Sequence, residues 1–169
     1  DLYINFYKDY NISFNLRTLI YNDPSRLYHA THLTFIFRNL YDLLNTWYNY
    51  LKYNPNYKTT VEEFLNINDY NFNLITDTET IFSNWKNHNV KYLFYDDLQK
   101  DNQTFVYDLC DYLGIRKYYD KRIKPKFKTN ITQQILFEDE NLIKYINDKI
   151  CIIENHTNRD LSHWKKWLH

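Results

Sequence analysis

The sequence predicts an α/β fold in which a parallel sheet is flanked by helices. Two short apolar runs, Thr31–Phe37 and Val90–Tyr95, have the composition of buried strands, and each is followed by apolar residues at helical spacing. Strands that alternate with helices in this way usually pair in parallel. At 169 residues the chain has about the length of one domain, so we expect residues 1–169 to form a single domain.

The first strand and the helix after it form the clearest part of this pattern. Residues 3–22 fit both the strand and the helix period, and "NDPSR" at residues 22–26 is typical of a turn. Thr31–Phe37 alternates as a mostly buried strand does. The helical period then begins, with one apolar stripe made by Leu40, Leu43, Leu44, Trp47 and Leu51.

Two helical segments precede the second strand. Thr60 and Glu63 have the spacing of a capping box, which predicts a short helix beginning near Val61. Ile75–Trp85 is predicted to be a second helical segment. The aromatic-rich Val90–Tyr95 is predicted to be the second buried strand.

The remainder of the chain is predicted to be helical on either side of a basic loop. The stretch "DDLQKDNQTFVYDLCDYLGI" predicts one helix, which Gly114 ends as a C′ residue. The basic loop runs from Arg116 to Asn130. After it, Glu138–Ile153 predicts the last helix, with one apolar stripe made by Leu142, Ile143, Ile146 and Ile150.

Composition narrows the function classes. Lys plus Arg and Asp plus Glu number 21 each, so no bulk charge attracts the protein to nucleic acid or to a membrane. No apolar run reaches the roughly 18 residues of a membrane span. Cys110 and Cys151 are too few and too far apart for a disulfide framework or a metal site, and no metal is expected. The many Asn and Tyr residues look like the coding bias of an AT-rich genome, so not every Tyr is expected to have a role of its own.

Arg38 is the first candidate binding residue, because it directly follows the first predicted strand. Ligands of parallel α/β sheets bind at the carboxyl ends of strands, and a guanidinium matches two phosphate oxygens at once. Thr46 follows eight residues later in the predicted helix, where its hydroxyl is able to donate to the same anion. An alternative stays open, in which Arg38 only pairs with Asp42.

Together these segments resemble the sulfotransferase family that uses 3′-phosphoadenosine 5′-phosphosulfate (PAPS). "LTFIFRNLYDLLNTWYNYL" is similar to the family's apolar strand, its arginine and its serine eight residues on; "VKYLFYDDLQKDNQTFVYDLCDYLGI" is similar to its strand ending in Tyr-Glu-Asp-Leu and the helix that follows. "LIKYINDKICIIENHTNRDLSHW" looks like the closing helix and Asp-Leu-x-x-Trp of the branch that modifies glycans. The resemblance is strongest over residues 27–167.

The resemblance implies a P-loop-kinase-like sulfotransferase domain and assigns roles to five residues. Arg38 and Thr46 would hold the 3′-phosphate of the nucleotide, Tyr95 would lie near the nucleotide, and Lys126 and Lys128 of the basic loop would close over it. PAPS would be the donor, and the protein would be an enzyme of the EC 2.8.2 type. A hydroxyl or amine, expected on a glycan but also conceivable on a small molecule, would be the acceptor. The catalytic base is not identified.

Three departures from the family pattern leave the activity open. The family's loop for the 5′-phosphosulfate, rich in Gly, Lys, Ser and Thr, has no counterpart, and the sole glycine, Gly114, has its own role at a helix end. Leu40 also stands where the family has proline, and Asp96 where it has glutamate. We therefore expect either that the domain is incomplete at its N-terminus, with the loop upstream of Asp1, or that the protein is a non-catalytic binding or structural relative.

The basic loop supports one further alternative. Arg116 to Asn130 carries seven cations against one acid, with aromatic residues between them, which fits a nucleic-acid-binding module. Nucleic acid is the least favoured of the partners considered. The compartment stays open between a secretory-pathway lumen and the cytoplasm.

Overall fold

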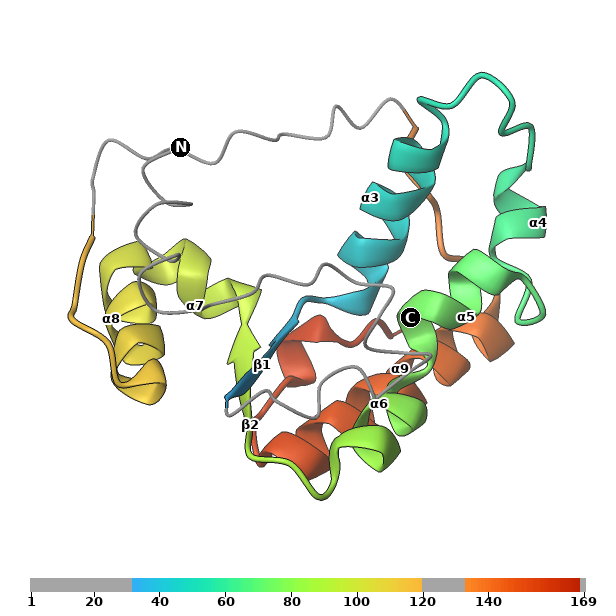
Figure 1. The fold of residues 1–169 in the computed structure, drawn as a ribbon. Coiled ribbons are helices and arrows are strands. Elements are labelled where there is room, and N and C mark those ends of the chain that lie inside the picture. The colour runs from blue at the N-terminus through green and yellow to red at the C-terminus, as the bar shows by residue number, and fades with distance from the viewer. Residues whose placement is uncertain (1–31, 120–132, 168–169) are drawn as a thin grey trace. The chain divides into compact units, whose positions relative to one another are not determined.

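The computed structural model describes residues 32–119 and 133–167, which fall into two compact units. The described part of the first unit is 32–36 with 83–119, and that of the second is 37–82 with 133–167. Figure 1 labels the elements of both. The interpretations made for residues 3–26 lie outside the described residues, and the single domain over 1–169 stays a prediction.

The first unit holds the sheet and two helices. Strands β1 (Leu33–Phe37, its last residue in the second unit) and β2 (Val90–Phe94) pair in parallel as a two-stranded sheet, followed by α7 (Tyr95–Lys100) and α8 (Asn102–Leu113). Figure 1 shows the two strands side by side. The predicted parallel pairing of the two apolar runs is confirmed.

Tyr112 of α8 joins the start of β1 to the turn before β2. The Tyr112 hydroxyl accepts from the Leu33 amide at 3.2 Å. The same hydroxyl lies within donating distance of two carbonyl oxygens, that of Leu33 at 2.9 Å and that of Asn89 at 2.8 Å. Gly114 then ends α8 in the left-handed conformation, at φ 65°, as the sequence predicts. One side chain therefore holds the leading ends of both strands.

The burial of β1 differs from the prediction on one face. Phe37 is buried and Leu33 and Phe35 are half-buried, but Thr34 is exposed and Ile36 is 52% exposed. The strand therefore has one covered face and one open face within this structure, and the expectation of a mostly buried strand is wrong for the second face. Period-2 alternation identifies the two faces but does not say whether another layer covers the outer one.

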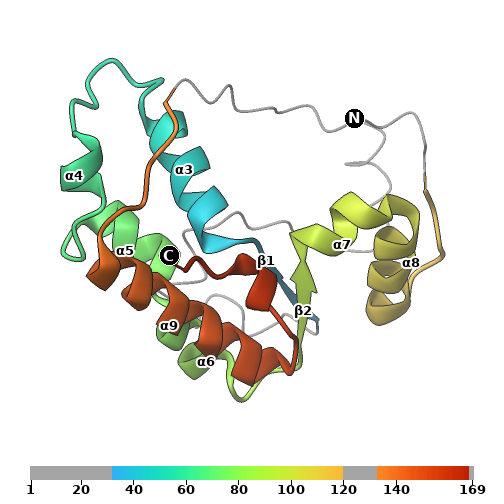
Figure 2. The same ribbon diagram turned by 180° about the vertical axis from the view of Figure 1, so that it is seen from behind.

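The second unit is built mainly of helices. Its elements are α3 (Leu40–Leu51), α4 (Val61–Phe64), α5 (Tyr70–Thr76), α6 (Thr78–Trp85, its last residues in the first unit), α9 (Glu140–Thr157) and the 3₁₀ turn η2 (Ser162–Trp164). Helix α3 packs against both α5 and α9, as Figure 2 shows from behind. Its buried face carries Leu40, Tyr41, Leu44 and Tyr48.

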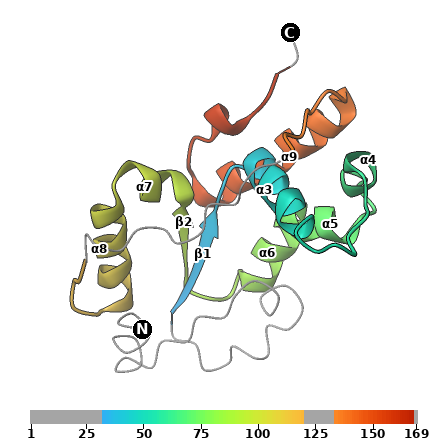
Figure 3. The same ribbon diagram turned by 90° about the horizontal axis from the view of Figure 1, so that it is seen from above.

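The predicted capping box is confirmed, and it places α4 against α3. The Thr60 hydroxyl accepts from the Glu63 amide at 3.2 Å, while the Glu63 carboxylate accepts from the Thr60 amide at 2.8 Å. Phe64, at the end of α4, is fully buried and lies 5.2 Å from the Tyr48 ring of α3. Figure 3 shows α4 and α5 in succession beside α3.

Aspartate side chains divide two segments that the sequence predicts as continuous helices. Ile75–Trp85 belongs to α5 and α6, which are separated at Asp77, whose carboxylate accepts from the Thr80 amide at 3.1 Å. The predicted helix that begins at Asp96 is likewise divided, into α7 and α8, at Asp101.

Asp101 stabilises the start of α8 in the same way. Its Oδ1 accepts from the amides of Gln103 at 3.0 Å and Thr104 at 3.1 Å. These hydrogen bonds lower the pKa of Asp101, the largest effect coming from the Thr104 hydroxyl. An Asp inside an apolar helical pattern thus starts a new helix, because its short side chain competes for backbone amides.

The last helix begins and ends slightly later than predicted. Asp139 caps α9 by accepting from the Leu142 amide at 2.8 Å, and Asn158 ends it with φ 51°. The predicted stripe is buried at Ile143, Ile146 and Ile150, whereas Leu142 is only half-buried.

Two buried asparagines of α3 bind the irregular segment before α9. Asn49 donates to the Gln133 carbonyl at 2.7 Å and accepts from the Gln133 amide at 2.9 Å, and Asn45 accepts from the Ile135 amide at 3.1 Å. Asn45 is 4% exposed and Asn49 2%, so these bonds replace water that the segment loses on burial. The two side chains therefore make the hydrogen bonds to this backbone segment that a neighbouring β-strand would otherwise make.

Substituting Asn49 tests this role. Asn49→Ala leaves the amide and carbonyl of Gln133 without their partners, and we expect the free energy of unfolding to fall by about 1–3 kcal/mol in chemical denaturation. The exposed Asn68 is the matched control, and Asn68→Ala should change stability by less than about 0.5 kcal/mol. Equal effects of the two substitutions would contradict the role given to Asn49.

Candidate functional site

Arg38 lies at the junction between β1 and α3, as predicted. It directly follows Phe37, the last residue of β1, and precedes Asn39, the N-cap of α3. The Asn39 Oδ1 accepts from the Tyr41 amide at 3.0 Å, which starts the helix immediately after the arginine. Arg38 is half-buried. The guanidinium is thus carried by a short, structured junction at the carboxyl end of a strand.

Thr46 lies on α3 at the border between its buried and open sides. Asn45 is buried, Thr46 is half-buried, and Tyr50, one turn on, is 56% exposed. With a rise of about 1.5 Å per residue, Thr46 is roughly 9 Å along the helix axis from Leu40. Thr46 is therefore not among the buried residues of α3. Shared binding of one anion by Arg38 and Thr46 stays a prediction.

The other three predicted site residues lie elsewhere in the chain. Tyr95 is half-buried and is the first residue of α7, so β2 ends one residue earlier than predicted. It belongs to the first unit, whereas Arg38 and Thr46 belong to the second. Lys126 and Lys128 lie outside the described residues. The structure therefore describes only the Arg38–Thr46 part of the predicted site within one unit.

Sequence reasoning missed a group of residues around the first turn of α3. The hydroxyl of Tyr41 lies 2.9 Å from Asn147 Oδ1 and 3.2 Å from the Ile143 carbonyl, both on α9. Burial raises the pKa of Tyr41 to about 12, so the hydroxyl stays protonated and remains a donor. Asn39 donates from Nδ2 to the Trp164 carbonyl at 3.4 Å. The chain after α9 thus returns to the helix that follows Arg38.

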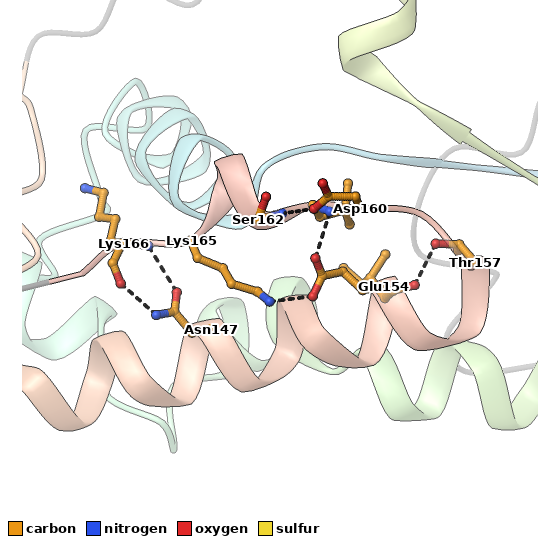
Figure 4. A network of polar contacts seen from close by, with 9 residues as sticks. Asn147, Glu154, Thr157, Asp160, Ser162, Lys165 and Lys166 are labelled. Atoms are coloured by element: carbon orange, nitrogen blue, oxygen red, sulfur yellow. Dashed lines mark hydrogen bonds and ion pairs between the residues drawn. The ribbon is translucent and has the colours of Figure 1, made fainter.

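Glu154 of α9 holds the segment that follows this helix, residues 158–167, by two contacts. Its carboxylate accepts from the Leu161 amide at 2.7 Å and pairs with the Lys165 ammonium at 2.5 Å (Figure 4). The Glu154 side chain is 19% exposed and the Lys165 side chain 14%. Burial alone would raise the pKa of Glu154, but the Lys165 and Leu161 hydrogen bonds lower it by more, to below its ordinary value. The Glu154 contact raises the pKa of Lys165.

Two further properties of the described residues bear on the sequence predictions. No group of three or more His, Cys, Asp or Glu side chains among them is placed to hold a metal ion. Within the same ranges, none of the helices combines the length and the apolar character needed to cross a bilayer.

His32, which precedes β1, is exposed and packs edge-on against the Tyr112 ring, with the ring centroids 5.2 Å apart.

Comparison with known proteins identifies the class to which this fold belongs. A family model described as "Sulfotransferase domain" matches residues 24–150, more than half of the chain. The chain therefore belongs to the sulfotransferase family, and the predicted family and fold class are confirmed. That membership supports sulfuryl transfer as the general activity.

A solved structure supports the same fold. The crystal structure of a sulfotransferase from Alicyclobacillus acidocaldarius is similar to this chain with a TM-score of 0.58 at 14% sequence identity. The likeness covers 96% of this chain and 74% of that one. No curated protein matches the chain.

The lowered pKa of Glu154 predicts an acid-sensitive contribution to stability. A carboxylate whose pKa is lower in the folded than in the unfolded protein stabilises the fold above the unfolded value, and this contribution is lost as the pH falls through the folded value. The ordinary value is 4.5. We expect the stability gap between the unchanged protein and Glu154→Gln to be full at pH 7 and to shrink below about pH 4.5.

Denaturation curves between about pH 7 and pH 3 measure this gap. The raised pKa of Lys165 does not interfere, because its contribution is lost only as the pH rises through its folded value, above 10.5. Glu138→Gln is the matched control, since Glu138 is exposed. A gap for Glu154→Gln that does not change with pH would show that the ion pair is not what the carboxylate contributes.

Proposed function

We propose that the protein transfers a sulfuryl group from PAPS to a hydroxyl or amine, and that the acceptor is a glycan. The observation that carries the proposal is the position of Arg38, half-buried between the end of β1 and the cap of α3, in a chain of the sulfotransferase family. A guanidinium there is suited to an anionic ligand at the carboxyl edge of a sheet. The donor of this proposal offers such a group in its 3′-phosphate.

Arg38 and Thr46 divide the binding of that phosphate between charge and hydrogen bonding. The guanidinium fork supplies two parallel charge-assisted hydrogen bonds and a positive charge. The hydroxyl of Thr46 supplies a donor from one side of α3. Arg38 holds its position because Asn39 starts the helix directly after it. The residues present thus fit a doubly charged phosphate.

The sequence resemblance adds Tyr95, Lys126 and Lys128 to the residues proposed to contact the nucleotide. Tyr95 follows β2 at the start of α7, which is the same kind of strand-end position as that of Arg38. Its aromatic ring is suited to contact with a nucleoside. Lys126 and Lys128 rest on the sequence resemblance alone, as cations that would approach the same nucleotide from the basic loop.

The reaction itself requires positioning and charge stabilisation more than covalent help. The acceptor oxygen or nitrogen forms a bond to sulfur as the bond from sulfur to the bridging phosphate oxygen breaks, and the acceptor proton passes to a base. Adenosine 3′,5′-bisphosphate leaves with the extra negative charge. By binding its 3′-phosphate, Arg38 and Thr46 orient the donor for in-line attack, as in phosphoryl transfer. No residue is assigned as the base.

The glycan acceptor rests on the resemblance to the glycan-modifying branch. The motif that carries it, Asp160-Leu161-x-x-Trp164, has a structural role here: Leu161 is fully buried, Trp164 is 2% exposed, and Asp160 accepts from the Ser162 amide at 2.9 Å. Leu161 and Trp164 thus belong to the core at the end of the fold, and Asp160 is exposed. An activity assay with different acceptors tests the glycan part of the proposal.

A non-catalytic relative is the second candidate, and Gly114 is the observation that favours it. This sole glycine of the chain ends α8 with φ 65° and is not available to bring a backbone close to a phosphate. A loop that wraps a phosphosulfate normally needs such residues. Transfer of labelled sulfate from PAPS decides between the two candidates. Transfer to a glycan panel supports the enzyme, and nucleotide binding without transfer to any acceptor supports the relative.

Substituting Arg38 tests the nucleotide site. Arg38→Gln removes two charge-assisted hydrogen bonds, each worth about 1.5–3 kcal/mol, so we expect affinity for adenosine 3′,5′-bisphosphate to fall at least about tenfold in titration calorimetry. Affinity for adenosine 5′-phosphate, which lacks the 3′-phosphate, should stay unchanged. Thr46→Val should weaken binding of the bisphosphate in the same selective way, by a smaller factor.

Arg116→Gln is the matched control for the loss of a guanidinium. Arg116 is exposed and has no role in the proposed nucleotide site, so its loss should leave the bisphosphate affinity unchanged. If Arg116→Gln weakens binding to random oligonucleotides while Arg38→Gln changes no nucleotide affinity, the sulfotransferase proposal is wrong and the nucleic-acid-binding alternative is favoured.

A further inference from the structure

One side of α3 carries a stacked pair of aromatic rings at the protein surface. The rings of Trp47 and Tyr50 lie 5.4 Å apart between their centroids, with 29° between their planes. Tyr50 is 56% exposed and Trp47 is half-buried. Ring pairs at such distances stabilise each other beyond the area that they bury. The pair therefore presents the Tyr50 ring to solvent while the Trp47 ring supports it.

The Trp47 indole is also held from α5. Its Nε1 lies 3.5 Å from Oδ1 of Asn71 and donates to it. Helices α3 and α5 pack against each other within the second unit. Trp and Tyr have only two side-chain torsions each, so an aromatic surface that is already held in place loses little entropy when a ligand binds.

The ring pair lies close to Thr46 on the same helix. Tyr50 comes one turn after Thr46, and residues four apart in an α-helix are neighbours on its surface. Along the helix axis Tyr50 is roughly 6 Å beyond Thr46, at about 1.5 Å per residue. Thr46, Trp47 and Tyr50 are all outside the buried face of α3. A ligand on the rings would thus lie next to the position proposed for the 3′-phosphate without occupying it.

The charges of α3 restrict the kind of ligand that the rings fit. Between Leu40 and Leu51 the helix contains one charged residue, Asp42, and no Lys or Arg. The next cation, Lys52, lies over the Tyr48 ring at 5.5 Å and donates to the Thr59 carbonyl at 3.4 Å. Proteins that stack nucleic-acid bases place cations beside their aromatic residues to bind the backbone. Without a cation on this helix, the rings fit an uncharged ligand better than a nucleic acid or a sulfated glycan.

An uncharged β-linked glycan has the matching chemistry. Glucose and N-acetylglucosamine each present a flat C–H face that packs on an aromatic ring, and a rim of polar groups that form hydrogen bonds. The phenol of Tyr50 and the indole of Trp47 likewise combine an apolar ring with a polar group. Of the large apolar side chains of α3, only that of Tyr50 is exposed, whereas a partner helix would need an apolar stripe over several turns.

We propose that Trp47 and Tyr50 bind the acceptor as an uncharged β-linked glycan, with one sugar ring stacked on Tyr50. This inference rests on the proposed function, of which it names the acceptor class. A glycan chain is longer than the donor, so sugars beside the one that reacts are bound at a distance from the sulfur. Binding of these remote sugars helps to position the reacting hydroxyl for in-line attack.

Substituting Tyr50 tests the stack. Tyr50→Ala removes the exposed ring, and we expect the affinity for cellohexaose and chitohexaose to fall about five- to thirtyfold in titration calorimetry, comparable to the loss of one stacked base. Tyr50→Phe keeps the ring and should retain most of this affinity. The affinity for adenosine 3′,5′-bisphosphate should stay unchanged in both variants. The thermal midpoint of each variant, measured without ligand, reports any loss of fold.

Trp167→Ala is the matched control for the loss of an exposed aromatic side chain. Trp167 is 70% exposed and lies outside α3, in the segment after α9, so its loss should change neither the oligosaccharide nor the bisphosphate affinity. Heparin serves as the sulfated comparison, and its binding should not depend on Tyr50. Weaker heparin binding in Tyr50→Ala, with unchanged binding of the uncharged oligosaccharides, would overturn the assignment.

The remaining outcomes separate this inference from the proposed function. If Tyr50→Ala weakens the bisphosphate as much as the oligosaccharides, or weakens the bisphosphate alone, the rings contact the nucleotide and the assignment is wrong. If the unchanged protein binds the bisphosphate but neither oligosaccharide, the nucleotide site of the proposed function survives and this inference fails. If it binds none of the three, both fail.

Discussion

Buried asparagine side chains are the interaction on which the second unit depends. Asn45 and Asn49 of α3 satisfy the backbone of residues 133–135, and Asn147 of α9 satisfies that of Lys166. A backbone segment without a sheet neighbour is otherwise costly to bury, because its amides and carbonyls lose water. An amide side chain offers both a donor and an acceptor, so a single Asn is able to bond both the N–H and the C=O of one backbone residue, as a neighbouring strand does. Two irregular segments can therefore pack against helices.

This arrangement explains why α3 is a suitable support for a binding site. The buried face of the helix is bonded to the segments before and after α9, and Asn39 caps its first turn. The position of Arg38 is thus determined by the end of a strand on one side and by a held helix on the other. Catalytic binding groups work best on such rigid elements, because less entropy is lost when the ligand binds.

Local signals account for the parts of the fold that were predicted well. The bounds of α3 follow from its 3.6-residue apolar stripe, and the Thr60–Glu63 capping box and the Gly114 helix end are each decided by a few neighbouring residues. The same apolar spacing was misleading where Asp77 and Asp101 interrupt it. Periodicity records which side chains face the core, and it does not record an Asp that takes up backbone amides.

The sequence by itself determined the family, the alternation of strand and helix, and the place of Arg38 at the end of a strand, because these depend on residues close together in the chain. Only the tertiary structure decided what Asn147, Tyr41 and Lys166 do, since their hydrogen bonds join positions 19 to 106 residues apart. Composition made the asparagines look like a coding bias. In the structure, Asn45, Asn49 and Asn147 are buried and bond backbone groups of distant segments, because a buried amide needs hydrogen-bond partners.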